Sequence, residues 1–242
     1  MLKKPRRTAV KSAQVAVQIL TERVFALKSV RLFYTKHGRM RFISHLDMTR
    51  FMARVIRRAE LPVWYTEGFN PHLYMTFALP LSLGFESEYE AVDIRLLQDD
   101  YDLSILCDKL NAVCPEYIRF FDAKEPQKKT SDIAFAEFNI VFDDAGEIKD
   151  NLNEFLNRDN ITVLKKTKKG DLKEIQIADK LKDFSLDIKD GNTVLKITLP
   201  AGSAENINPE LFLNKFFEIY EKYYCCVITR TAILDKEKNL FK

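Results

Sequence analysis

The chain has 242 residues, enough for one large or two small domains, and its 46% hydrophobic and 30% charged residues exclude a disordered protein. The net charge of +3 is too small to indicate a partner, and no apolar run is long enough to span a bilayer, so we expect no membrane association. The four cysteines form no CxxC pair and no zinc spacing, which favours free thiols and a cytoplasmic location.

The first 28 residues are interpreted as a basic N-terminal extension. Their weakly apolar stretch is interrupted by glutamines and is followed by no small-residue cleavage site, so we do not interpret them as a signal peptide. Residues 30–43 alternate between apolar and polar side chains, which predicts a strand, or a hairpin that turns at His37 and Gly38.

A helix is predicted over residues 46–60, with Ser44 as its N-cap and Asp47 in the capping-box position. The elements predicted after it are strand-like segments on either side of a turn at 68–71, a strand at 89–97, a helix at 103–115 and a strand at 116–123. The resulting order βαββαβ is typical of a ferredoxin-like domain, which we assign to residues 29–124.

Residues 125–132 are polar and charged, and they are predicted to be a linker. A second run of strands and helices follows over residues 133–242, with helices predicted at 146–158 and 208–223 and an extra strand between 174 and 189. The predicted fold is therefore α+β, with two tandem ferredoxin-like (βαββαβ) halves that have antiparallel sheets.

The predicted helix at 46–60 separates apolar from basic side chains. From residue 30 to residue 59 there are eight lysines and arginines but only one acid, Asp47. On a helical wheel the apolar side chains share one face, and the opposite face carries Arg50, Arg54, Arg57 and Arg58. Arginines one turn apart present planar donors that suit phosphates or carboxylates, so this face is a candidate binding surface for an anionic partner.

Two plainer interpretations of the arginines stay open. The arginine face could simply be solvated. Alternatively, Glu86, Glu88 and Glu90, which alternate along one predicted strand, could be its counter-charges across the sheet.

The turn Gly68-Phe69-Asn70-Pro71-His72 could present polar groups from a rigid loop. His45 and His72 are candidates for a general acid or base, although a histidine that only bonds the backbone of a turn is the commoner case. A metal site would require His37, His45 and His72 to meet; no further ligand spacing supports one, and we expect none. Aromatic residues are frequent around the basic run and would suit stacked RNA bases, but alternating aromatics in strands are more often core.

The run that begins at Gly38 and ends at Ile94, "GRMRFISHLDMTRFMARVIRRAELPVWYTEGFNPHLYMTFALPLSLGFESEYEAVDI", resembles the radical-SAM-linked protein family, a bacterial family of uncharacterised function. The resemblance is strong over about residues 30–97. The family pattern is carried here by Ser44, His45, Asp47, Arg50, Arg54, Arg57, Arg58, Gly68, Phe69, Asn70, Pro71 and His72.

This resemblance implies a partner with radical SAM chemistry and, by gene neighbourhood in the family, a link to ribosomal or RNA metabolism. The chain has no Cys-x3-Cys-x2-Cys triad, so it cannot hold the radical SAM cluster itself, and we expect no cofactor in this chain. The resemblance thus implies a separate radical SAM protein that acts in trans.

Three functional hypotheses follow from the sequence. The favoured one is a non-catalytic accessory module that binds transfer or ribosomal RNA through the arginine face and works with the radical SAM enzyme. The second is a docking adaptor for that enzyme without RNA contact. The third is a His-dependent enzyme that processes RNA or a small anionic substrate, with His45 or His72 as the acid or base.

Overall fold

The computed structural model describes residues 27–144, 146–166 and 170–242, so nearly all of the predicted N-terminal extension lies outside the described residues. The first half of the fold contains β1 (Lys28–Lys36), α2 (His45–Arg58), β2 (Met75–Phe77), β3 (Glu86–Leu96), α3 (Leu106–Asn111) and β4 (Ile118–Lys124). The second half contains β5 (Ile133–Phe142), α4 (Lys149–Asn157), β6 (Thr162–Lys166), β7 (Leu172–Gln176), β8 (Phe184–Lys189), β9 (Asn192–Pro200), α5 (Pro209–Tyr220) and β10 (Cys226–Asp235).

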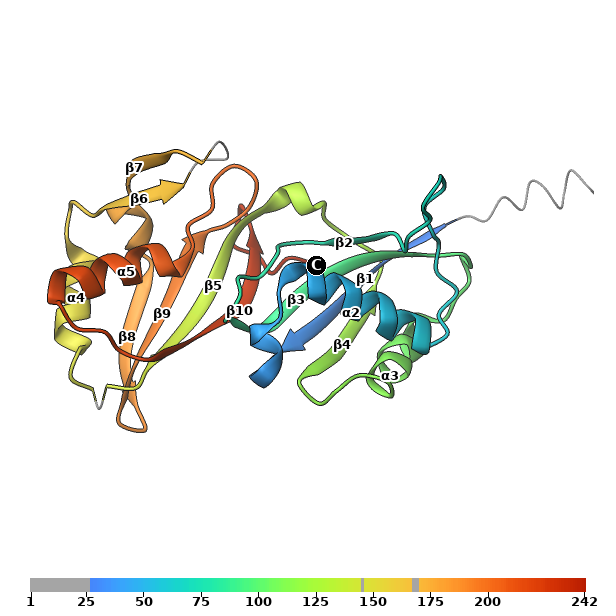
Figure 1. The fold of residues 1–242 in the computed structure, drawn as a ribbon, viewed down its shortest axis with the longest axis horizontal. Helices are drawn as coiled ribbons and strands as arrows, with labels where there is room; N and C mark the ends of the chain where they lie inside the picture. Colours follow the sequence, from blue (N-terminus) through green and yellow to red (C-terminus); the bar gives the residue numbers. More distant parts are fainter. Residues whose placement is uncertain (1–26, 145, 167–169) are drawn as a thin grey trace, which may run out of the picture.

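The two halves share one continuous sheet, in which the strands follow the order β4-β1-β3-β10-β5-β9-β8 and β2 also pairs with β3 (Figure 1). Neighbouring strands are antiparallel except β3 and β10, which are parallel and pair at only two positions. Strands β6 and β7 form a separate hairpin. The predicted α+β class with mostly antiparallel strands is confirmed, but a single sheet replaces the separate sheets that we expected.

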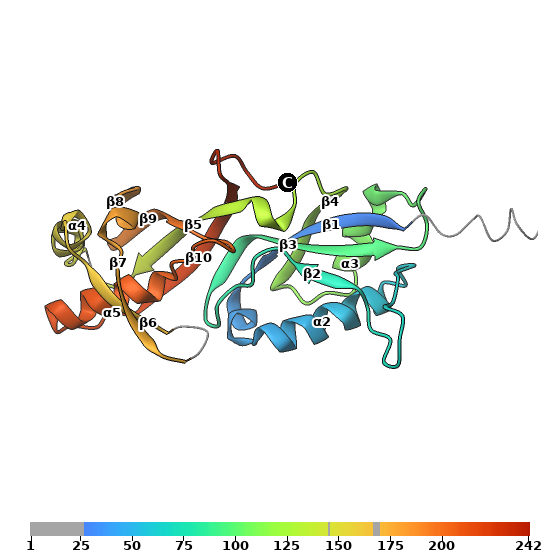
Figure 2. The same cartoon turned by 90° about the horizontal axis from the view of Figure 1, so that it is seen from above.

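The helices α2 and α5 lie on the same side of this sheet, and the C-terminus lies on the other side (Figure 2). In the first half, α2 and α3 pack on alternate side chains of β1, and Met52, Ile56 and Leu110 are fully buried there. In the second half, Phe155 of α4 and Phe216 of α5 fill the corresponding core. The helix faces predicted to be apolar therefore drive the packing of both halves.

The segment after β1 differs from the hairpin that was one of the two predictions for residues 30–43. A 3-10 helix, Gly38–Phe42, follows the strand instead. Gly38 has a positive φ of 55°, its N–H donates to Glu86 Oε1 at 3.1 Å, and a Cβ there would lie 2.6 Å from the ring of Tyr117. The chain therefore turns away from the sheet at Gly38, because only glycine fits both this conformation and this contact.

The far side of the sheet in the first half is covered by residues near the C-terminus. Phe241 is fully buried, and its carbonyl accepts a hydrogen bond of 2.7 Å from the Tyr89 hydroxyl. The guanidinium of Arg31 lies over the Phe241 ring, binds both oxygens of Asp93 at 2.7 and 2.8 Å, and donates to the carbonyls of Lys128 and Lys242. A buried arginine thus joins the sheet, the predicted linker and the last residue of the chain.

Asp144 links β5, α4 and β9 in the second half. Its buried carboxylate accepts from the backbone N–H of Ile148 at 2.9 Å and from the backbone N–H and hydroxyl of Thr193 at 2.8 and 2.7 Å. Burial by itself would raise the pKa of Asp144, but these hydrogen bonds outweigh it and hold the pKa below its usual value.

We predict that Asp144→Asn lowers the free energy of unfolding at neutral pH by about 1–3 kcal/mol, since charge-assisted hydrogen bonds are lost. Because the folded-state pKa is depressed, the carboxylate stabilises the fold above its unfolded-state pKa, and this contribution is lost as the pH falls through the folded-state pKa. Urea unfolding of both proteins from about pH 7 to about pH 3 should show the difference shrinking with acidity. A difference that stays constant would contradict this account.

No helix in the described part of the chain is long and apolar enough to cross a membrane.

Candidate functional site

The arginine face of α2 is present in the structure. The helix begins after Ser44, whose hydroxyl accepts from the Asp47 N–H at 3.1 Å, as predicted for the N-cap. The hydroxyl also donates to Asp47 Oδ2, so Asp47 closes the cap through the side chain and not through the Ser44 backbone. Ser44 and Asp47, two of the predicted binding residues, are therefore explained by their role in starting the helix.

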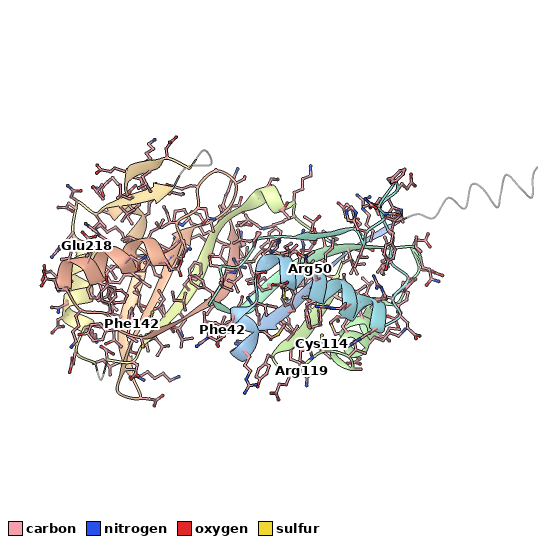
Figure 3. All side chains as sticks on the ribbon, in the orientation of Figure 1. Phe42, Arg50, Cys114, Arg119, Phe142 and Glu218 are labelled. Atoms are coloured by element: carbon pink, nitrogen blue, oxygen red, sulfur yellow. The ribbon has the colours of Figure 1, made fainter. Side chains whose placement is uncertain are left out.

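All four arginines of the face are exposed, while Met48, Met52, Val55 and Ile56 of the same helix are buried. Figure 3 shows Arg50 on α2, on the side of the sheet nearest the viewer. Arg50 Nη1 lies 3.3 Å from Asp47 Oδ1, an exposed contact that contributes little. Among the described residues, no carboxylate lies within 4 Å of Arg54, Arg57 or Arg58. Within the part of the chain that the structure describes, three adjacent guanidinium groups thus face solvent without a direct ion pair.

The alternative in which Glu86, Glu88 and Glu90 neutralise the arginine face is not what the structure shows. Glu86 lies 3.5 Å from Arg41 and 3.4 Å from His37. Glu90 is buried with an arginine of β10, and Glu88 is exposed near the second half of the sheet. The three carboxylates have separate surroundings, and the described structure pairs none of them with the α2 arginines.

The predicted turn at 68–72 is the tip of a hairpin-like loop between α2 and β2, whose base bonds the end of β3 and which projects away from α2 (Figure 1). Tyr65 pairs with Leu73, and the His72 carbonyl accepts from the Thr66 N–H at 2.8 Å. Phe69 is fully exposed at the tip. The Nδ1 atom of His72 lies 3.0 Å from the Thr66 hydroxyl oxygen. This contact joins the two sides of the loop, so His72 has a structural role in the turn. Gly68, Asn70 and Pro71 are exposed as well.

The three histidines do not converge. His37 and His45 lie near the N-terminal end of α2, whereas His72 lies in the loop that follows its C-terminal end and bonds Thr66 there. A helix of this length spans about 20 Å, which is far beyond the reach of a shared metal ion. The described residues contain no group of three or more His, Cys, Asp or Glu side chains that could hold a metal. His45 instead packs edge-on against Phe77, with ring centroids 4.9 Å apart.

The aromatic residues near the basic run divide into two groups. Phe33 and Tyr34 are buried in the sheet and are core residues. Phe42, Tyr65 and Phe69 are exposed, and Figure 3 places Phe42 beside the N-terminal end of α2, where the two halves meet. Only the exposed group is available to stack on a base or to contact a partner.

The structure adds a group of buried residues of which the sequence interpretation had considered only Glu90, and that in another role. Tyr34 and Lys36 of β1, Glu90 of β3 and Arg230 of β10 are all buried close to His45 at the junction of the halves. A signal for two of them was present in the sequence. Tyr34 and Lys36 continue the period of two set by Val30 and Leu32, which places them on the core face of the strand.

The fold and the exposed arginine helix define a mixed α+β protein with a basic surface on one of its halves. Residues 29–209 match the family described as "Uncharacterized protein conserved in bacteria (DUF2344)", which is most of the chain. The chain therefore belongs to this family. A search of curated proteins finds no match.

Proposed function

We propose that this protein is a non-catalytic accessory module that binds RNA through α2 and works with a separate radical SAM enzyme. One observation carries the RNA part: Arg54, Arg57 and Arg58 are exposed along one helix, with no carboxylate within 4 Å among the described residues. Planar guanidinium groups in a row suit successive phosphates, which are the dominant contacts of RNA-binding surfaces. The radical SAM partner rests on the sequence resemblance.

A fully exposed aromatic residue in the same half supports an RNA-binding role. Phe69 lies at the tip of the loop that follows α2, and Figure 1 shows this loop projecting away from the helix. Exposed aromatic rings and basic groups on one half of a protein are the combination that holds a single-stranded segment, because bases stack on the rings while phosphates meet the arginines. Arg50 is a weaker contributor, since it already has Asp47 as a partner.

Arg54→Gln/Arg57→Gln/Arg58→Gln is predicted to weaken binding to bulk transfer RNA and to lower the slope of log affinity against log salt by about 2 to 3. Each phosphate contact releases a counterion, so three lost contacts reduce the salt dependence by nearly three. The measurement is fluorescence anisotropy of labelled RNA between about 50 and about 200 mM salt. Glutamine keeps most of the side-chain length on an exposed face, so we expect the variant to fold.

The matched control is Lys173→Gln/Lys189→Gln/Lys196→Gln, which removes the same charge from exposed positions of the second half. It should bind RNA with nearly the unchanged salt slope. If both variants lose the same amount of RNA affinity and salt slope, RNA binding depends on the net charge of the protein and not on the position of the arginines on α2. If the unmodified protein does not bind RNA even at the lowest salt, the RNA-binding role is wrong.

We also propose that the two halves are ferredoxin-like units. The strand orders support this proposal. They are β4-β1-β3-β2 in the first half and β10-β5-β9-β8 in the second. In both halves the last strand in sequence lies beside the first, and the third strand lies between the first and the second. In this assignment the hairpin of β6 and β7 is an insertion in the second unit. The assignment explains why each half has two helices over one face of its strands.

A docking adaptor is the second candidate function, and one observation favours it. Phe42, Leu46 and Leu83 are exposed apolar side chains near the N-terminal end of α2, where the Gly84 N–H bonds the Arg41 carbonyl at 2.8 Å. Exposed apolar residues beside a basic helix would suit an acidic protein surface. Binding of a radical SAM protein that survives the triple arginine substitution, without RNA binding, would favour this candidate.

A further inference from the structure

A cleft of about 370 Å³ lies where the two halves meet. It is lined by the segment between β2 and β3, by β5, β6 and β10, and by the start of α5, which is on the same side of the sheet as α2 (Figure 2). The side chains of the lining that bear on its chemistry are Leu81, Phe85, Lys165, Leu211, Asn214 and Arg230. A volume of this size is within the range of small-molecule sites.

Arg230 brings hydrogen-bond donors to this cleft. The residue is 2% exposed, and a guanidinium can donate from Nε, Nη1 and Nη2. Nε donates to Glu90 Oε1 at 3.0 Å, and Nη2 donates to Glu90 Oε2 and to the Leu79 carbonyl, both at 2.6 Å. Nη1 bonds no described residue, and it is not sealed from solvent, because Asn139 Oδ1 is the one described side-chain atom that is sealed without a partner. The N–H groups of Nη1 are therefore open to an acceptor in the cleft.

Lys165 of β6 is the other cation that lines the cleft. Its amine donates to the Asn206 carbonyl at 2.7 Å, and an ammonium has further N–H groups to donate. Two carboxylates balance the two cations: Glu210 of α5 lines the cleft, and Glu90 binds Arg230. A site with balanced charges and free donors suits a ligand with one negative charge better than a ligand with two.

Much of the remaining lining is apolar. Leu81 and Leu211 are half-buried, and Phe85 packs edge-on against Phe138 with ring centroids 6.3 Å apart. A cavity of about 150 Å³ holds one benzene ring, so this cleft has room for one ring and a short chain. Apolar walls with a few fixed polar groups are typical of small-molecule sites.

We propose that this cleft binds a small monocarboxylate with an apolar body. The carboxylate accepts hydrogen bonds from Arg230 Nη1 and from the Lys165 amine, and the apolar body lies against Leu81 and Leu211. Because Glu90 already holds the guanidinium in place, binding costs little side-chain entropy at Arg230. The site is separate from the arginine face of α2 and does not depend on the RNA-binding role.

The test is a titration of the full chain with phenylpropionate, followed by two-dimensional NMR of the backbone and side-chain amides. Phenylpropanol is the matched neutral probe, since it has the same ring and chain without the carboxylate. We expect the carboxylate to bind about tenfold more tightly than the alcohol, because it accepts charge-assisted hydrogen bonds. Equal affinities, or no binding of phenylpropionate at about 10 mM, would overturn the proposal.

Lys165→Gln tests whether the carboxylate binds in this cleft. It should weaken phenylpropionate binding about threefold to fivefold, the effect of an exposed ion pair, and leave phenylpropanol binding unchanged. Lys173→Gln is the matched control, because Lys173 pairs with Lys165 across the β6–β7 hairpin, is exposed and does not line the cleft. An equal loss in both variants would indicate a general charge effect and contradict this site.

Asn214→Trp tests the position of the apolar body. Asn214 is an exposed residue of α5 that lines the cleft, so a larger side chain there narrows the cleft without disturbing the core. The variant should unfold in urea as the unmodified protein does and should lose phenylpropionate binding. A folded variant that binds phenylpropionate normally would place the ligand elsewhere and overturn the proposal.

Discussion

Replacing Arg230 by methionine should lower the free energy of unfolding by about 3–5 kcal/mol, because it strands a buried carboxylate. Arg230 and Glu90 are both almost fully buried, and the guanidinium also donates to the Leu79 carbonyl at 2.6 Å. Neither group can reach solvent without opening the junction of the two halves. Urea unfolding followed by circular dichroism measures the loss.

The double variant Glu90→Gln/Arg230→Met separates the cost of the stranded Glu90 charge from the cost of the packing lost with the Arg230 side chain. Removing both charges leaves no unpaired ion, so the double variant should be more stable than Arg230→Met alone. A single variant that loses less than about 1 kcal/mol would contradict a dry, paired site at this junction. A double variant as unstable as the single one would show that the lost packing, and not the stranded charge, sets the cost.

The second large effect is expected for Phe241→Ala, which should lose about 3–5 kcal/mol of unfolding free energy. The Phe241 ring is fully buried on the far side of the sheet, and its centroid lies 4.2 Å from the Arg31 guanidinium carbon. Truncating it leaves a cavity and removes the ring that covers a buried charge. The measurement is again the midpoint and slope of urea unfolding.

Phe69→Ala is the matched control for this second prediction, because the same residue type is fully exposed there. It should change stability by less than about 0.5 kcal/mol. If Phe241→Ala behaves like Phe69→Ala, the chain near its C-terminus does not hold the sheet in the way described. Phe69→Ala also serves as a stably folded variant for the RNA measurement.

Local features of this fold could be predicted from the sequence. The helix predicted over 46–60 is found at His45–Arg58, because a Ser44 cap, an apolar stripe and a proline at position 62 are signals within a single segment. The turn at 68–71 could be predicted for the same reason. The exposure of the α2 arginines follows directly from the apolar stripe on the opposite face.

Long-range features could not be predicted. Arg31 belongs to the same basic run as the α2 arginines, yet it is buried. No local pattern could predict this, because the partners that enclose it lie 62, 97 and 211 residues away in the sequence. Lys36 belongs to this run as well, yet it is buried, and only the position of β10 beside β3 shows that it lies near Arg230. The joining of both halves into one sheet depends on two residue pairs that no local pattern indicates.

The position of β10 in the sheet has a consequence for the order in which the protein is made. This strand lies between β3 and β5, although it is translated after every other strand of the sheet. Until it emerges from the ribosome, β3 and β5 each leave an edge unpaired, and the halves have no strand to link them. The nascent chain is therefore most exposed to wrong pairing late in translation, when nearly all of its hydrophobic surface has already been synthesised.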